Sequence, residues 1–106
     1  MVKRGEVWLI RLDPTEGREI RKTRPCLIVS PPEIHDYLDT VIAVPMTTGS
    51  KPAGYRVPVR FRAKAGLILI EQIRAVDKSR LATKLGKIDG PTLTKVLATL
   101  RETFAV

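Results

Sequence analysis

Short apolar runs separated by proline, glycine and charged residues are the feature that most limits what this chain can fold into. Residues 6–12 and 55–62 alternate between apolar and polar side chains, with the two-residue period of a β-strand. Other runs are almost continuously apolar, as in buried strands; they span residues 26–29, 40–44 and 66–73, and a shorter strand is expected at 84–88. Pro58 cannot donate to a strand ladder, so residues 55–62 are expected at a sheet edge or a bulge.

The carboxyl-terminal segment has the periodicity of a helix instead. Apolar side chains recur there every three or four residues, at Leu93, Val96, Leu97, Leu100 and Phe104. Asp89 or Gly90 can cap this helix, and Pro91 fits its first turn. We expect a mainly β protein, a small barrel of about five to seven strands with a C-terminal helix packed on it. A chain of 106 residues with 43% hydrophobic content suits one core, so residues 1–106 are expected to form a single domain.

Two polar loops interrupt the expected strands. Residues 13–25 are charged and contain Gly17, and residues 46–54 follow Pro45. Connections of about 12 residues without regular structure are usually functional, so both loops are candidates for a site. A third connection, residues 30–39, is rich in turn residues, and we expect its His35 to be a solvated loop side chain.

An excess of positive charge narrows the class of partner. Lys and Arg number 19 against 11 Asp and Glu, a formal net charge of +8. Such an excess favours a phosphate backbone, because binding releases condensed counterions and steers the encounter. A basic surface without a specific partner is the alternative.

The sequence does not favour a disulfide-bonded, secreted or membrane-spanning protein. The one cysteine, Cys26, lies in an apolar run, so we expect no intramolecular disulfide and a packing role rather than a nucleophile. The amino terminus does not look like a secretory leader, and the apolar runs are far shorter than the about 20 residues that cross a bilayer. We therefore expect a cytoplasmic protein without membrane contact.

Two kinds of nuclease chemistry are disfavoured. Cleavage by paired imidazoles needs two histidines, and the chain has only His35. A metal-dependent nuclease needs clustered carboxylates, but Glu33, Asp36 and Asp39 have no recognised ligand spacing. We expect neither a metal ion nor another cofactor.

Ordered motifs along nearly the whole chain resemble the MazF/PemK toxins. They include Arg4-Gly5-Glu6-Val7-Trp8, Arg24-Pro25, Val44-Pro45-Met46-Thr47-Thr48, Glu71-Gln72-Ile73-Arg74 and Leu85-Gly86. The resemblance implies an SH3-like barrel that forms a homodimer. It also implies a sequence-specific, metal-independent endoribonuclease that cleaves single-stranded mRNA and is inhibited by a cognate antitoxin.

The resemblance also assigns candidate catalytic residues. By motif, the family's catalytic arginine falls on Arg24, its catalytic threonine on Thr47 and its loop carboxylate on Glu19. A guanidinium can hold two phosphate oxygens, and a threonine hydroxyl can donate to a third. Glu19 either accepts the proton of the RNA 2′-hydroxyl or only contacts the substrate. The family often has Gly-Ser-Glu-Gln in this loop, whereas the chain has Gly-Arg-Glu-Ile at 17–20, which leaves the base preference open.

Further polar residues are candidates for holding RNA. Those expected to contact it are Arg18, Arg21, Lys22, Thr48, Lys51 and Arg56, with Arg60 and Arg62 farther along the same strand. Each of them is otherwise an ordinary solvated side chain. Aromatic residues make up only 5% of the chain, so base selection is expected to depend on hydrogen bonds to unstacked bases.

Two other functions remain open. A CcdB-like toxin directed at DNA gyrase would use the same barrel without needing Arg24 or Thr47. A non-catalytic basic module would bind nucleic acid and leave it intact. Only RNA cleavage explains why the chain has both the Arg-Pro loop and the Pro-x-Thr loop.

Overall fold

Antiparallel strands form most of the computed structural model, which describes residues 1–12, 17 and 22–106. The strands are β1 (Glu6–Arg11), β2 (Thr23–Ile28), β3 (Thr40–Thr47), β4 (Arg56–Phe61), β5 (Lys64–Leu69), β6 (Arg74–Asp77) and β7 (Leu81–Lys87). The helices are α1 (Pro32–His35) and α2 (Gly90–Thr103), with 3₁₀ turns η1 (Ile70–Gln72) and η2 (Lys78–Arg80). The expected mainly β fold with a C-terminal helix is confirmed.

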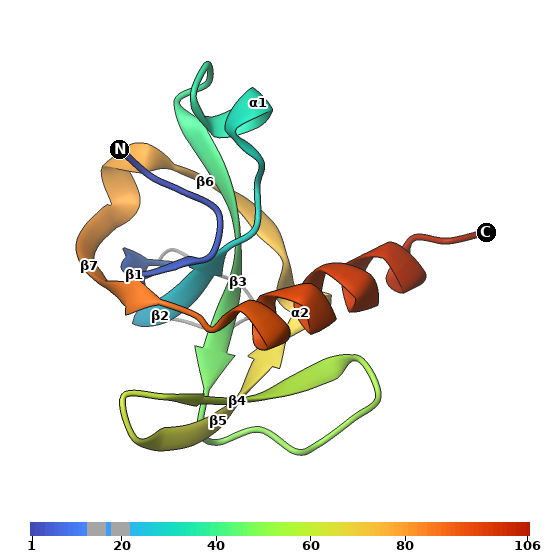
Figure 1. The fold of residues 1–106 in the computed structure, drawn as a ribbon. Coiled ribbons are helices and arrows are strands. Elements are labelled where there is room, and N and C mark those ends of the chain that lie inside the picture. The colour runs from blue at the N-terminus through green and yellow to red at the C-terminus, as the bar shows by residue number, and fades with distance from the viewer. Residues whose placement is uncertain (13–16, 18–21) are drawn as a thin grey trace.

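The seven strands make one curled sheet in the order β4-β5-β3-β2-β1-β7, with β6 paired to β3 off this path. Strand β3 is the centre of the curl, because its first half pairs with β6 and its last two residues pair with β5. Figure 1 shows the sheet curving away from the β4–β5 hairpin toward β7, with α2 lying across its side. Strand β4 pairs only with β5, so the edge position expected from Pro58 is confirmed.

Both faces of β1 and β2 are buried, which is why their burial departs from simple alternation. Val7 and Leu27 belong to a core cluster that includes Val96 of α2. Ile10 and Cys26 belong to a second cluster inside the curl. Residues of opposite parity on one strand therefore both lie in the core, as in a sheet that is covered on each side.

The sequence pattern misplaced the chain between residues 66 and 77. The expected strand 66–73 ends at Leu69, and η1 turns the chain so that β6 begins at Arg74. Ile70 in that turn is only 1% exposed, so the apolar run continues through the turn and resembles one strand. Through this turn the chain passes from β5, which pairs with the last residues of β3, to β6, which pairs with the first half of β3.

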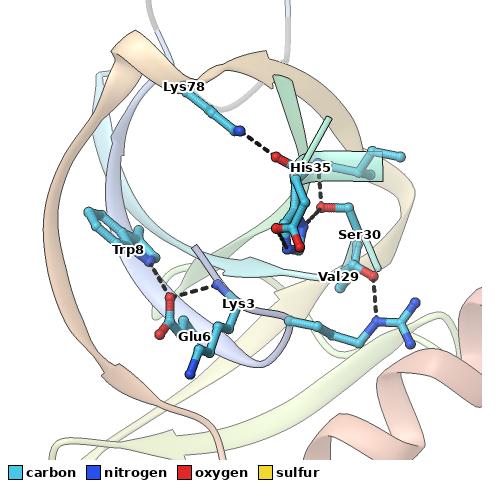
Figure 2. A network of polar contacts seen from close by, with 10 residues as sticks. Lys3, Glu6, Trp8, Val29, Ser30, His35 and Lys78 are labelled. Carbon is cyan, nitrogen blue, oxygen red and sulfur yellow. Dashed lines mark hydrogen bonds and ion pairs between the residues drawn. The ribbon is translucent and has the colours of Figure 1, made fainter. Parts of the chain in front are cut away.

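His35 is not the solvated loop side chain that the sequence predicted. It is 1% exposed, because α1 packs against β3. Its Nδ1 lies 2.8 Å from Ser30 Oγ, which accepts a hydrogen bond from the backbone N–H of Ile42. Lys78 donates to the backbone carbonyl of His35 (Figure 2). The turn-rich linker is thus fixed from both sides.

A buried carboxylate ties β1 to β7. Glu6 Oε1 accepts hydrogen bonds from the backbone N–H of Lys3 at 2.9 Å and from Trp8 Nε1 at 3.0 Å, and Lys84 Nζ lies 2.8 Å from Oε2. Figure 2 shows Lys3 and Trp8 converging on this carboxylate. Burial alone raises the pKa of Glu6, but these partners outweigh it and lower the pKa from 4.5 to about 2.

Helix α2 begins as the sequence predicted. The Asp89 carboxylate caps it by accepting from the backbone N–H of Thr92 at 2.9 Å, and the Thr92 hydroxyl and N–H lower the pKa of Asp89. The helix packs on β4 and η1 and buries Val96 fully. Among the residues described, no helix is long and apolar enough to span a membrane.

Candidate active site

The register of β2 and β3 brings two separate sequence motifs together. Cys26 pairs with Pro45, and Leu27 pairs with Val44. The same register continued by two residues sets Arg24 opposite Thr47, and both residues still belong to their strands. Directly opposite residues of an antiparallel pair point to the same face of a sheet, so this pairing points both side chains to one side.

Arg24 and Thr47 line one cleft of about 320 Å³. Its walls come from β2, β3, the β4–β5 hairpin and β7: Arg24, Pro25, Met46, Thr47, Thr48, Val59, Phe61, Arg62, Lys64, Ala65, Gly66 and Leu85. This lining has three cationic side chains and no carboxylate within the part of the chain that the structure describes. The cleft is therefore suited to an anion.

The Thr47 hydroxyl is held at the cleft by its own loop. Its Oγ1 accepts a hydrogen bond from the backbone N–H of Gly49 at 3.2 Å. A hydroxyl has one hydrogen to donate in addition to its acceptor sites, so Thr47 keeps that hydrogen for a ligand. The turn contact thus positions the hydroxyl without using its donor.

Arg24 has its guanidinium available for a ligand. It is exposed, and no hydrogen bond or ion pair engages its side chain within residues 1–12, 17 and 22–106. Its planar fork can hold two oxygens of one phosphate at once. Thr48, also exposed, contributes a second hydroxyl to the same cleft.

Gly66 is a residue that the sequence reasoning missed. Its neighbour Leu67 on β5 pairs with Thr47, and a Cβ at position 66 would lie 2.7 Å from the carbonyl oxygen of Thr47. Real Cβ atoms do not approach a backbone oxygen so closely, so any side chain at 66 must displace the backbone of Thr47. A glycine inside an apolar strand pattern was the available signal.

Most of the other candidate residues either lie outside the described residues or do not line the cleft. Glu19, Arg18 and Arg21 lie outside the described residues. Lys22 is exposed, has a positive φ of 66°, and its carbonyl accepts from the N–H of Leu12 at 2.9 Å.

Lys51, Arg56 and Arg60 do not line the cleft, whereas the candidate Arg62 does, together with Lys64, which the sequence analysis did not single out. The Arg56 guanidinium lies 2.6 Å from a Glu71 carboxylate oxygen and donates to the Lys51 carbonyl at 2.9 Å. Its bond to Glu71 raises the pKa of Arg56. Arg56 therefore has a structural partner, and the structure does not bring it to the candidate site.

Cys26 has the packing role that the sequence predicted. It is buried beneath the site, and burial raises the pKa of its thiol to about 12. A thiol with this pKa stays protonated and is a poor nucleophile near neutral pH.

Comparisons with known proteins identify the family of the chain. Residues 3–104 match the family described as PemK-like, MazF-like toxin of type II toxin-antitoxin system. The chain is 35% identical over 106 residues to the endoribonuclease PemK of Escherichia coli, covering 93% of this chain and 79% of that protein.

Solved structures share the fold. The MazF structure from Deinococcus radiodurans superposes with a TM-score of 0.87 at 23% identity, covering 99% of this chain and 97% of that one. A mycobacterial endoribonuclease, solved in complex with its cognate antitoxin, gives a TM-score of 0.81 at 23% identity, with 96% and 93% covered.

Proposed function

This chain belongs to the PemK-like, MazF-like toxins of type II toxin-antitoxin systems, and we propose on that premise that it is an endoribonuclease that cleaves single-stranded mRNA at specific sequences. One observation carries the proposal: Arg24 of β2 and Thr47 of β3, from separate sequence motifs, line the same cationic cleft. A phosphodiester in this cleft meets a guanidinium and a hydroxyl, and both can stabilise charge on phosphorus.

RNA supplies its own nucleophile in this mechanism. The 2′-oxygen bonds to phosphorus while the bond from phosphorus to the 5′-oxygen breaks, which leaves a 2′,3′-cyclic phosphate and a 5′-hydroxyl. Arg24 holds nonbridging oxygens, and the Thr47 hydroxyl donates to the same group. The 2′-hydroxyl loses its proton to a base, for which Glu19 is our candidate, and the leaving oxygen takes a proton from solvent.

The cleft supplies positive charge from side chains, so the proposed reaction is independent of metal ions. Purified protein is expected to cut unstructured RNA in excess chelator and to leave 2′,3′-cyclic phosphate ends. Loss of cleavage on chelation, restored by a divalent cation, contradicts this mechanism.

Substitutions at the cleft test the assignment. Arg24→Ala and Thr47→Val are each expected to slow single-turnover cleavage by about 100-fold, the cost of removing one oxyanion donor. Arg101→Ala is the matched control, because Arg101 is exposed on α2 and does not line the cleft. Equal activity of all three variants removes Arg24 and Thr47 from the reaction.

The alternatives predict different outcomes for the same assay. A gyrase-directed toxin and a non-catalytic binding module both leave RNA intact, whether or not Arg24 is present. RNA cleavage by the wild-type chain that depends on Arg24 therefore separates the proposed function from both.

We also propose that the protein acts in the cytoplasm as a homodimer and that a cognate antitoxin inhibits it. The family description names a toxin-antitoxin system, and the mycobacterial relative was solved with its antitoxin. Light scattering of the purified chain tests the dimer. Restored growth on co-expression with a protein encoded beside it tests the antitoxin.

A further inference from the structure

The lining of the cleft is chemically mixed. Arg24, Thr47 and Thr48 contribute groups that suit a phosphate. The β4–β5 hairpin and β7 add two apolar side chains to the same lining, Phe61 and Leu85, which we call the apolar wall. A phosphate is strongly hydrated and gains nothing from that wall, whereas a nucleobase has apolar faces that do.

The hairpin tip is fixed in place before any ligand binds. Phe61 pairs with Lys64 across a two-residue turn, in which Arg62 has a φ of 51° and Ala63 a φ of 64°. Two positive φ values are typical of the tight hairpin turn that matches strand twist, although neither residue is a glycine.

Contacts to β7 hold this tip. The Arg62 guanidinium donates to the Leu85 carbonyl at 2.5 Å and stands 5.9 Å from the centre of the Phe61 ring. Gly86 leaves room for that ring, because a Cβ at position 86 would lie 3.3 Å from Phe61 Cζ. The wall is therefore preorganised, and a ligand does not have to order it.

We propose that Phe61, Arg62, Lys64 and Leu85 form a subsite for the base of a nucleotide that flanks the cleaved phosphodiester. This inference rests on the proposed function and adds a determinant of sequence preference to it. The base lies against Phe61 and Leu85 while the neighbouring phosphate lies between Arg24 and Thr47. Two sets of residues in one cleft thus bind the two parts of one nucleotide.

The charged groups of this subsite indicate which bases it accepts. Arg and Lys side chains donate hydrogen bonds and accept none. The O6 and N7 acceptors of guanine and the carbonyl oxygens of uracil complement Arg62 and Lys64, whereas the exocyclic amino group of adenine or cytosine, at the equivalent edge of the base, would face a second donor. The subsite is expected to favour guanine or uracil at one position next to the cut.

Mapping of cut sites on a long unstructured RNA tests the proposal. The wild-type chain is expected to show guanine or uracil at one flanking position in most cuts. Lys64→Gln is expected to relax that preference several-fold, because an amide both donates and accepts. Phe61→Leu is expected to keep the fold and raise KM with little change in kcat, because it removes the aromatic wall from binding.

Arg101→Gln is the control, since it removes an exposed cation of α2 that does not line the cleft, and its cut-site profile is expected to match wild type. An unchanged base profile in Lys64→Gln together with an unchanged KM in Phe61→Leu, with normal cleavage, overturns the subsite and leaves the proposed function standing. Absence of RNA cleavage by the wild-type chain overturns both. Thermal unfolding of each variant shows whether an altered profile comes from a damaged fold.

Discussion

Removal of the Glu6 charge tests the physical account of how β1 is held to β7. In the folded chain the pKa of Glu6 is about 2 against 4.5 for the free side chain. Each pKa unit corresponds to about 1.4 kcal/mol, so the ionised carboxylate adds up to about 3 kcal/mol to the free energy of unfolding. Glu6→Gln is expected to remove most of that amount at neutral pH.

The pH dependence follows from the direction of the pKa change. Because the folded-state pKa is lowered, this stabilisation is fully present above about pH 4.5 and is lost as the pH falls toward about 2. Urea unfolding at a series of pH values measures it. The difference in the free energy of unfolding between wild type and Glu6→Gln is expected to become smaller as the pH falls from about 4.5 to about 2.

Glu102→Gln is the matched control, because it makes the same chemical change on an exposed residue of α2. We expect it to change the free energy of unfolding by less than about 0.5 kcal/mol. The reasoning is refuted if both variants lose the same stability, or if the gap for Glu6→Gln does not change with pH.

Two further predictions concern the site. Gly66→Ala is expected to lower RNA cleavage at least about 10-fold, because the added Cβ displaces Thr47, while circular dichroism stays that of the folded chain; full activity would show that β5 accommodates the methyl group. The Cys26 thiol is expected to resist alkylation in the native state near about pH 8 and to react at once in urea, because burial raises its pKa to about 12. Rapid native-state alkylation, followed by mass spectrometry, would contradict that burial.

Local patterns predicted the elements that depend on neighbouring residues. Pro58 predicted the edge position of β4, because a residue without a backbone N–H cannot donate to a neighbouring strand. The cap of α2 by Asp89 was predictable, because its hydrogen-bond partner Thr92 is only three residues later in the chain. The motif match selected Arg24 and Thr47, which the structure places in one cleft.

The errors arose where distant residues decide the outcome. His35 is buried because Ser30, β3 and Lys78 surround it, and no local pattern records those contacts. Arg56 is drawn away from the cleft by Glu71, which is 15 residues later in the chain. Arg62, which the sequence did offer as a candidate for holding RNA, lines the cleft, and its guanidinium donates to the Leu85 carbonyl.

A structure of the protein with a short RNA whose 2′-hydroxyls are methylated tests the central claim most directly, since such RNA binds but cannot supply the nucleophile. We predict one phosphate with oxygens within about 3 Å of both the Arg24 guanidinium and the Thr47 hydroxyl. Two different phosphates on these residues, or RNA bound outside the cleft, would contradict the account.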